Sequence, residues 1–167
     1  MMPTPAARPS KTVRESQLET SSLMMPADEN VRGHVFGGAV LALMDKAAAV
    51  CAMRHTRASC VTVSVDRVDF REPIRVGDLV ILKASVNFVG RSSMEIGIRV
   101  EAENMLTGVR RHTNSCYITY VALDRDSKPM EVPGLICETV DENRRNEAGA
   151  ERRRRRQEER EAEKRTK

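Results

Sequence analysis

The sequence predicts an α+β fold in which one long apolar helix comes early and a run of antiparallel strands follows it. Between Ala39 and Met53, only Asp45 and Lys46 are polar or charged. Downstream, long alternating or apolar stretches are separated by short turns that contain glycine. An antiparallel sheet has one face to bury, and an apolar helix lying across it would bury that face. We therefore expect a central helix wrapped by a curved sheet.

The residues before the helix predict a short strand and a loop. Leu18 to Met25 is expected to form a strand that ends at Pro26. Asn30 to Gly38 is expected to be a loop. The helix should then extend to about His55.

Four strands are expected after the helix. In the first, Val61, Val63 and Val65 alternate with polar residues, which is the period of a half-buried strand. Short connections follow at 75–78, 90–93 and 106–108. The predicted strands are Val61 to Phe70, Leu79 to Val89, Met94 to Ala102 and Val109 to Leu123.

The ends of the chain differ from this core in composition. Residues 1–15 are expected to be a disordered leader, 16–135 the folded domain, and 136–167 a charged helix or tail. An arginine run from Arg152 to Arg156 is flanked by glutamates. A solvated helix with ion pairs between neighbouring turns is favoured over a nucleic-acid or phosphate-binding arm, because the glutamates cancel most of the positive field.

Composition excludes several classes of protein. The 167 residues suit one domain with appendages, and no apolar run approaches the roughly 20 residues of a membrane span. The four cysteines and three histidines lack metal-ligand spacing, which favours reduced thiols in a cytoplasmic protein without a metal or cofactor. Aromatic residues make up only 3% of the chain, so a stacking surface for nucleic acid is not expected.

Asp45 is the residue that most needs an explanation. A carboxylate on an apolar helix costs several kcal/mol, by order of magnitude, unless it is paired or takes part in chemistry. A structural hydrogen-bonded aspartate is one reading. The other follows from Gly37 and Gly38, since free N–H groups at a helix start can stabilise an oxyanion. Asp45 lies about two turns beyond Gly38, so such a site would need a second subunit.

These residues resemble a known family. Asn30-x-x-Gly33-His34-x-Phe36-Gly37-Gly38 followed by Met44-Asp45, together with Gly90-Arg91-Ser92-Ser93, is similar to the hotdog-fold acyl-CoA thioesterases, which include bacterial acyl-CoA hydrolases and cytosolic animal enzymes. The resemblance implies a long helix wrapped by a curved antiparallel sheet. It also implies a homo-oligomer, either a dimer or a trimer of dimers, with active sites at the dimer interface.

The resemblance implies hydrolysis of an acyl-CoA to a fatty acid and coenzyme A. Asp45 of one subunit would act as general base, or less favourably as nucleophile. Asn30 of the other subunit would orient the water or the thioester. The Gly38 N–H would stabilise the oxyanion at the start of the helix.

The resemblance also implies residues that bind the substrate. Phe36 and Gly37 would lie at the acyl group, and Arg91, Ser92 and Ser93 would form a coenzyme A loop. An ordinary hairpin turn is the alternative for that loop, and His34 is expected to shape its own loop rather than transfer a proton. Two rival functions remain: a hotdog hydratase or dehydratase, and a non-catalytic acyl-CoA or nucleotide sensor.

Overall fold

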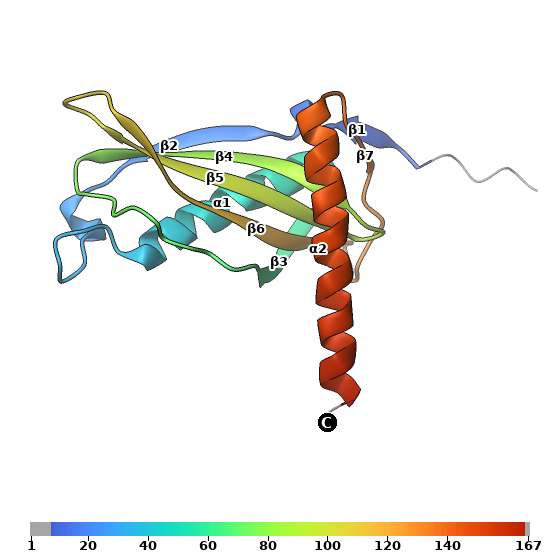
Figure 1. Ribbon diagram of the computed structural model, residues 1–167. Coiled ribbons are helices and arrows are strands. Elements are labelled where there is room, and N and C mark those ends of the chain that lie inside the picture. The colour runs from blue at the N-terminus through green and yellow to red at the C-terminus, as the bar shows by residue number, and fades with distance from the viewer. Residues whose placement is uncertain (1–7, 166–167) are drawn as a thin grey trace, which may run out of the picture.

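The computed structural model describes residues 8–165 and has the α+β architecture that the sequence predicts. A curved five-stranded antiparallel sheet, in the order β2-β4-β5-β6-β3, wraps around helix α1, and helix α2 crosses the other face (Figure 1). This is the hotdog arrangement. The elements are β1 (Ser10–Thr12), β2 (Leu18–Leu23), α1 (Gly37–Thr56), β3 (Ser59–Val65), β4 (Asp78–Val89), β5 (Ser93–Asn104), β6 (Arg110–Leu123), β7 (Gly134–Ile136) and α2 (Val140–Arg165), with 3-10 turns at Val13–Glu15 and Pro26–Asp28.

Helix α1 has one buried face and one open face. Its buried side chains pack into the core formed with the sheet: Val40, Met44, Ala47, Ala48, Cys51, Ala52 and His55. Leu41, Val50 and Met53 are exposed on the rest of the helix. The single chain therefore leaves an apolar surface on α1 that a partner could cover.

Side chains alternate across the sheet. On β5, Met94, Ile96, Ile98 and Val100 are buried in the core with α1, whereas the charged Arg99 lies on the opposite, outer face. The consecutive hairpins β4–β5 and β5–β6 form the centre of the sheet. Strand β3 pairs only with β6, so it is an edge strand of the sheet.

Several element boundaries differ from the prediction, most of them by one or two residues. The helix begins at Gly37, two residues before Ala39. Strand β3 ends at Val65 instead of continuing to Phe70. Beyond it, the N–H of Asp66 donates to the Tyr117 carbonyl at 2.9 Å, and Arg71 N–H reaches Thr113 only at 3.2 Å. The segment thus leaves the sheet gradually, and alternation alone does not reveal where ladder pairing stops.

The described part of the expected leader is ordered. Strand β1 pairs in parallel with β7, Ser10 opposite Gly134 and Thr12 opposite Ile136. Residues 8–15 therefore differ from the expected disorder, whereas residues 1–7 lie outside the described residues. A three-residue polar strand whose partner lies more than a hundred positions away leaves no periodic signal in the sequence.

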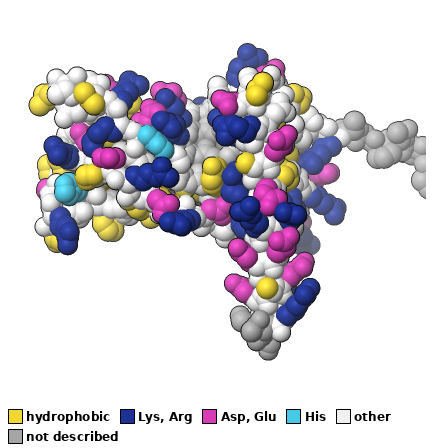
Figure 2. Space-filling model, viewed as in Figure 1, with side chains coloured by type: hydrophobic (Ala, Val, Ile, Leu, Met, Phe, Trp, Pro, Cys, Tyr) yellow, Lys and Arg dark blue, Asp and Glu magenta, His cyan; other side chains and the backbone are white. Residues whose placement is uncertain are grey.

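The charged C-terminal segment forms a helix, which is one of the two forms, helix or tail, that the sequence predicted. A capping box starts α2: the Glu142 N–H donates to Thr139 Oγ1 at 3.1 Å, and the Thr139 N–H donates to the Glu142 carboxylate at 3.1 Å. The first part of α2 lies on the sheet and the end projects beyond it (Figure 1). Acidic and basic side chains intermingle on the projecting end (Figure 2). Among the described helices, none is long and apolar enough to cross a membrane.

Candidate active site

Asp45 is held by two hydroxyl groups from neighbouring strands. It is half-buried on α1. The Thr62 hydroxyl donates to Asp45 Oδ1 at 2.8 Å, and the Tyr120 hydroxyl donates to the same oxygen at 2.7 Å. Tyr120 also contacts the Asp45 backbone carbonyl at 2.9 Å. Thr62 and Tyr120 face each other in the β3–β6 ladder, so strand register brings both donors to one atom.

These hydrogen bonds leave the other carboxylate oxygen open. Burial raises the pKa of Tyr120, and the neighbouring Asp45 also raises it, so the phenol remains a proton donor. Within the described residues, Asp45 Oδ2 accepts no side-chain hydrogen bond. A carboxylate fixed through one oxygen and open at the other has the geometry to accept a proton from a bound water.

The start of α1 presents unpaired backbone N–H groups. Phe36 is the N-cap residue and makes no side-chain cap, and the first N–H groups of a helix have no intrahelical acceptor. The Phe36 ring lies over Gly38, where an added Cβ would come within 2.2 Å of it. At Gly37 an added Cβ would lie 3.4 Å from the Phe70 ring. The glycines let two aromatic rings approach this helix start closely.

Asn30 shapes the loop that leads into the helix. Its Oδ1 accepts the N–H of Arg32 at 2.8 Å and that of His34 at 3.3 Å, and its own N–H donates to the His34 carbonyl at 2.7 Å. Its Nδ2 donates to no described residue, so the amide remains free to contact a ligand. Asn30 lines a cleft of about 370 Å³ together with Gly37, His34 and Phe70.

The single chain brings together only part of the predicted site. Asn30 and Gly37 share one cleft, whereas Asp45 is not among its lining residues and instead contacts Thr62 and Tyr120. The same helix thus carries two halves of a site separated along its length. Asp45 and the helix start therefore do not meet within one chain, and the contribution of a second subunit stays a prediction.

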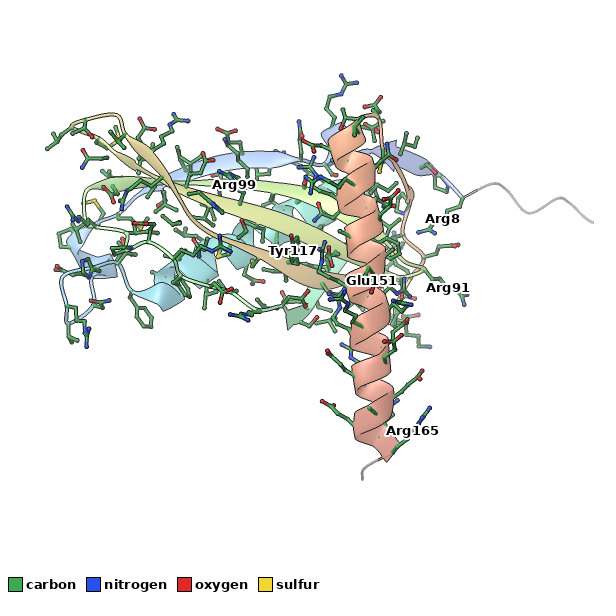
Figure 3. The ribbon with its side chains drawn as sticks, in the orientation of Figure 1. Arg8, Arg91, Arg99, Tyr117, Glu151 and Arg165 are labelled. Carbon is green, nitrogen blue, oxygen red and sulfur yellow. The ribbon has the colours of Figure 1, made fainter. Side chains whose placement is uncertain are left out.

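The 90–93 turn lies next to the C-terminal helix. The Val132 N–H donates to the Arg91 carbonyl at 2.9 Å, and Arg8 Nη2 donates to the Gly90 carbonyl at 2.8 Å, which fastens the turn. Ser92 and Ser93 line a cleft of about 240 Å³ that α2 also borders. Arg91 is exposed outside that lining, at the end of the sheet beside α2 (Figure 3).

The cysteines are poorly suited to covalent chemistry. All four are free, and burial raises the pKa of Cys51 and Cys116 to about 12. Because the thiolate is the reactive form, these two thiols are weak nucleophiles near neutral pH. Neither Cys51 nor Cys116 is therefore a candidate nucleophile.

Sequence reasoning missed Thr62 and Tyr120. Thr62 is one polar residue in an alternating strand, and Tyr120 stands in an apolar one, so neither is distinctive by itself. The available signal was the strand pattern combined with a pairing of β3 and β6, which would have placed the two side chains opposite each other.

The fold and these polar groups define a hotdog protein with the parts of a hydrolytic site. The family model described as Thioesterase superfamily matches residues 32–109. An uncharacterised acyl-CoA thioester hydrolase of Bacillus subtilis is 40% identical over 129 residues, which cover 77% of this chain and 75% of that protein. The mouse cytosolic acyl coenzyme A thioester hydrolase is 37% identical, over 83% of this chain and 37% of its own length.

Solved structures agree. An acyl-CoA hydrolase from Staphylococcus aureus, in complex with butyryl coenzyme A, coenzyme A and coenzyme A disulfide, is 35% identical with a TM-score of 0.87, covering 95% of this chain and 96% of that one. An apo hexameric acyl-CoA thioesterase is 39% identical with a TM-score of 0.87, covering 90% and 97%. The chain belongs to the acyl-CoA thioester hydrolase family of the thioesterase superfamily.

Proposed function

We propose that this protein hydrolyses acyl-CoA thioesters to a free carboxylic acid and coenzyme A, with Asp45 as general base. The observation that carries the proposal is the Asp45 carboxylate, fixed through Oδ1 by two hydroxyl donors and open at Oδ2. The family relationship supplies the reaction class, since the relatives are named acyl-CoA hydrolases and thioesterases.

The reaction proceeds by attack of water on the thioester carbonyl. Asp45 Oδ2 takes a proton from the water as its oxygen bonds to the carbonyl carbon. The negative charge then collects on the carbonyl oxygen, where the Gly38 N–H of the helix start donates to it. Collapse of this intermediate breaks the C–S bond, and the departing thiolate of coenzyme A takes the proton from Asp45, which restores the carboxylate. The products are the acid and the thiol.

Asn30 orients the water or the thioester through its free Nδ2 amide. Support comes from the S. aureus hydrolase, of which alanine variants of an asparagine, an aspartate and a threonine have solved structures. Those positions are separated by 15 and then 17 residues. Asn30, Asp45 and Thr62 are separated by the same intervals in this chain.

We propose that two subunits complete each site. The edge strand β3 exposes Val61, Val63 and Val65, each more than 40% accessible, and α1 exposes Leu41, one turn before the Asp45 that contacts β3. An exposed apolar edge strand is a site for pairing with another chain. Side-by-side packing of two copies would cover this surface and bring Asp45 of one subunit to Asn30 and Gly38 of the other.

The remaining site residues would bind the two parts of the substrate. Phe36 and Gly37 at the helix start would contact the acyl group, and the 90–93 turn with Arg91, Ser92 and Ser93 would bind coenzyme A. The hexameric structural relative supports assembly of dimers into a hexamer. The mouse relative is named cytosolic, which supports a cytoplasmic location for this protein.

Hydrolysis of a panel of short- to long-chain acyl-CoAs tests the proposal. The wild type should turn over at least part of the panel, and Asp45→Ala should lower kcat by roughly two orders of magnitude or more. Lys46→Ala, the exposed neighbour on α1, is the matched control and should keep full activity. If folded wild type turns over no acyl-CoA, the hydrolase function is wrong and a binding or sensing role replaces it.

A further inference from the structure

Helix α2 crosses the outer face of the sheet toward the edge strand β3. The Asn146 side chain donates to the Asn87 carbonyl on β4 at 2.9 Å. Further along the helix, Arg152 pairs with the buried Glu95 on β5 at 2.7 Å. Because β5, β6 and β3 follow β4 in the sheet, these contacts advance toward the edge as the helix proceeds.

The helix passes the edge of the sheet near Arg156. Arg156 pairs at 2.6 Å with Asp66, the first residue after β3. Residues 157–165 continue as helix beyond that point (Figure 1). These nine residues extend about 14 Å. Since neighbouring strands lie about 4.8 Å apart, the end of α2 projects past the sheet by about the width of three strands.

The projecting end carries glutamates that its own chain does not pair. Glu159, Glu161 and Glu163 form no ion pair with a described residue. Residues 152–156 are all arginine, whereas 158–163 contain four glutamates and one arginine. Two such helices attract each other when they run antiparallel, because the acidic half of each then lies beside the basic half of the other.

Pairing of two chains through β3 would place a second copy under the projecting end, and this step rests on the subunit pairing proposed above. Two edge strands that pair antiparallel in one continuous sheet are related by a two-fold axis perpendicular to the sheet. Such an axis keeps both α2 helices on the outer face and makes them antiparallel. Gln157 and Val63 of β3 line one cleft, so the axis passes close to this part of the helix.

We propose that residues 157–165 of α2 lie across the outer sheet face of a second copy of this chain, antiparallel to that copy's α2. The acidic half of each helix pairs with exposed arginines of the other. Arg154 and Arg155 are available for this contact, since their ion pairs within the chain are only to glutamates of the same helix. The contact adds a charged interface on the outer face to the apolar one along β3.

Cross-linking of single introduced cysteines tests the placement of α2. In Gln157→Cys the two thiols lie nearest the axis, so a short bis-maleimide should join two copies into a covalent dimer. Glu147→Cys is the matched control, because it is exposed on the same helix and lies ten residues earlier, about 15 Å further from the axis in each copy. Wild type gives the background from the partly exposed Cys60 and Cys137.

The proposal predicts a covalent dimer for Gln157→Cys and none above background for Glu147→Cys. Adding Val61→Lys/Val65→Lys to Gln157→Cys should abolish the cross-link, because the helix contact depends on pairing through β3. Three results would overturn the placement: equal linking of both cysteine variants, no linking in a verified dimer, or a cross-link that persists after the β3 substitutions.

The dissociation constant of the dimer tests the charge pairing. Glu161→Lys/Glu163→Lys should raise this constant by about tenfold or more at low salt, since both helices lose attraction and gain repulsion. The control Asp126→Lys/Glu138→Lys makes the same change in net charge at exposed acids outside the contact and should match wild type. Equal constants for the two double variants would exclude ion pairs between the helices.

Failure of the proposed function is distinguishable from failure of this inference. A wild type that forms the dimer but turns over no acyl-CoA would end the hydrolase assignment, and cross-linking would still decide the helix contact. A wild type that light scattering shows to be a monomer would overturn the pairing through β3 and the helix contact together.

Discussion

At the scale of single residues, the position of the Asp45 carboxylate depends on two hydroxyl groups that donate to the same oxygen. In the proposed mechanism, Thr62 and Tyr120 take no proton from the water, but they occupy Oδ1 and so leave Oδ2 for it. Loss of a positioning residue lowers kcat more than it changes KM, because positioning stabilises the transition state more than the ground-state complex.

Tyr120→Phe tests this role. It removes one hydrogen bond to a charged group, so kcat should fall by roughly ten- to a hundredfold, with KM changed less than twofold. Steady-state kinetics across the acyl-CoA panel measures the split, and a thermal melt checks folding. Val121→Ala, one residue further along β6, is the control. An unchanged kcat in folded Tyr120→Phe would exclude the positioning role.

His55 links single-residue chemistry to stability. It is fully buried, its Nε2 contacts the Pro133 carbonyl at 3.0 Å, and Nδ1 has no partner. Burial lowers the pKa of His55, whereas the hydrogen bond to Pro133 opposes that shift. The unfolded chain therefore binds a proton below about pH 6.5 that the folded chain does not. Stability should be fully present above that pH and decline as pH falls.

Thermal midpoints of wild type and His55→Gln between pH 7.5 and 5.5 check this prediction. The wild type should lose stability more steeply on acidification than the variant, in which the titrating group is absent. Other titrating groups act alike in both proteins, so the difference in slope isolates His55. Identical slopes would show that His55 does not control this pH range.

At the scale of elements, the attachment of α2 to the sheet depends on Glu95. Its side chain is 1% exposed and binds both Arg152 and Arg156. Glu95→Gln leaves the partly buried Arg152 guanidinium without a counter-charge and removes one of the two acids that pair with Arg156, so it should lower the free energy of unfolding by about 3 kcal/mol. Urea denaturation measures the loss.

Glu151→Gln provides the comparison for that measurement. Glu151 pairs with Arg154 and Arg155 on the exposed side of α2, where solvent screens both ion pairs, so removal of its charge should cost much less than removal of the Glu95 charge. Equal losses for the Glu95 and Glu151 variants would mean that the buried network does not hold the helix.

The elements themselves were readable from the sequence to different extents. Apolar length predicted α1, alternation predicted β3, and short turns delimited β4, β5 and β6, because all these signals are local. The docking of α2 was not predictable in this way. Arg152 and Glu95 are 57 positions apart, and an arginine that meets a buried acid has the same sequence surroundings as one that faces water.

The residues of the candidate site were also predictable from sequence only where their signal was local. Asp45 and Gly38 stood out because a lone carboxylate and a glycine pair are unusual in their local settings, whereas Asn30 was a candidate only through the family resemblance. Thr62 and Tyr120 did not, since their significance arises only from the register of β3 against β6. Contacts between distant segments were the part that local patterns could not supply.

At the scale of the whole molecule, the exposed apolar edge of β3 is the surface we assign to subunit pairing. The double substitution Val61→Lys/Val65→Lys would place two positive charges on this edge strand. The double variant should elute as a monomer in light-scattering chromatography and lose activity, because the site is divided between subunits. A monomer with full activity would contradict a shared site, and an unchanged oligomer would place the interface elsewhere.

The central claim is that each active site combines Asp45 of one subunit with Asn30 of another, and complementation tests it most directly. Asn30→Ala and Asp45→Ala proteins, each inactive alone, are mixed after dissociation and reassembled. Half of the random dimers are mixed and each carries one intact site of two, so about a quarter of wild-type activity should return. If no activity returns from verified mixed oligomers, both residues act within one chain and the account is wrong.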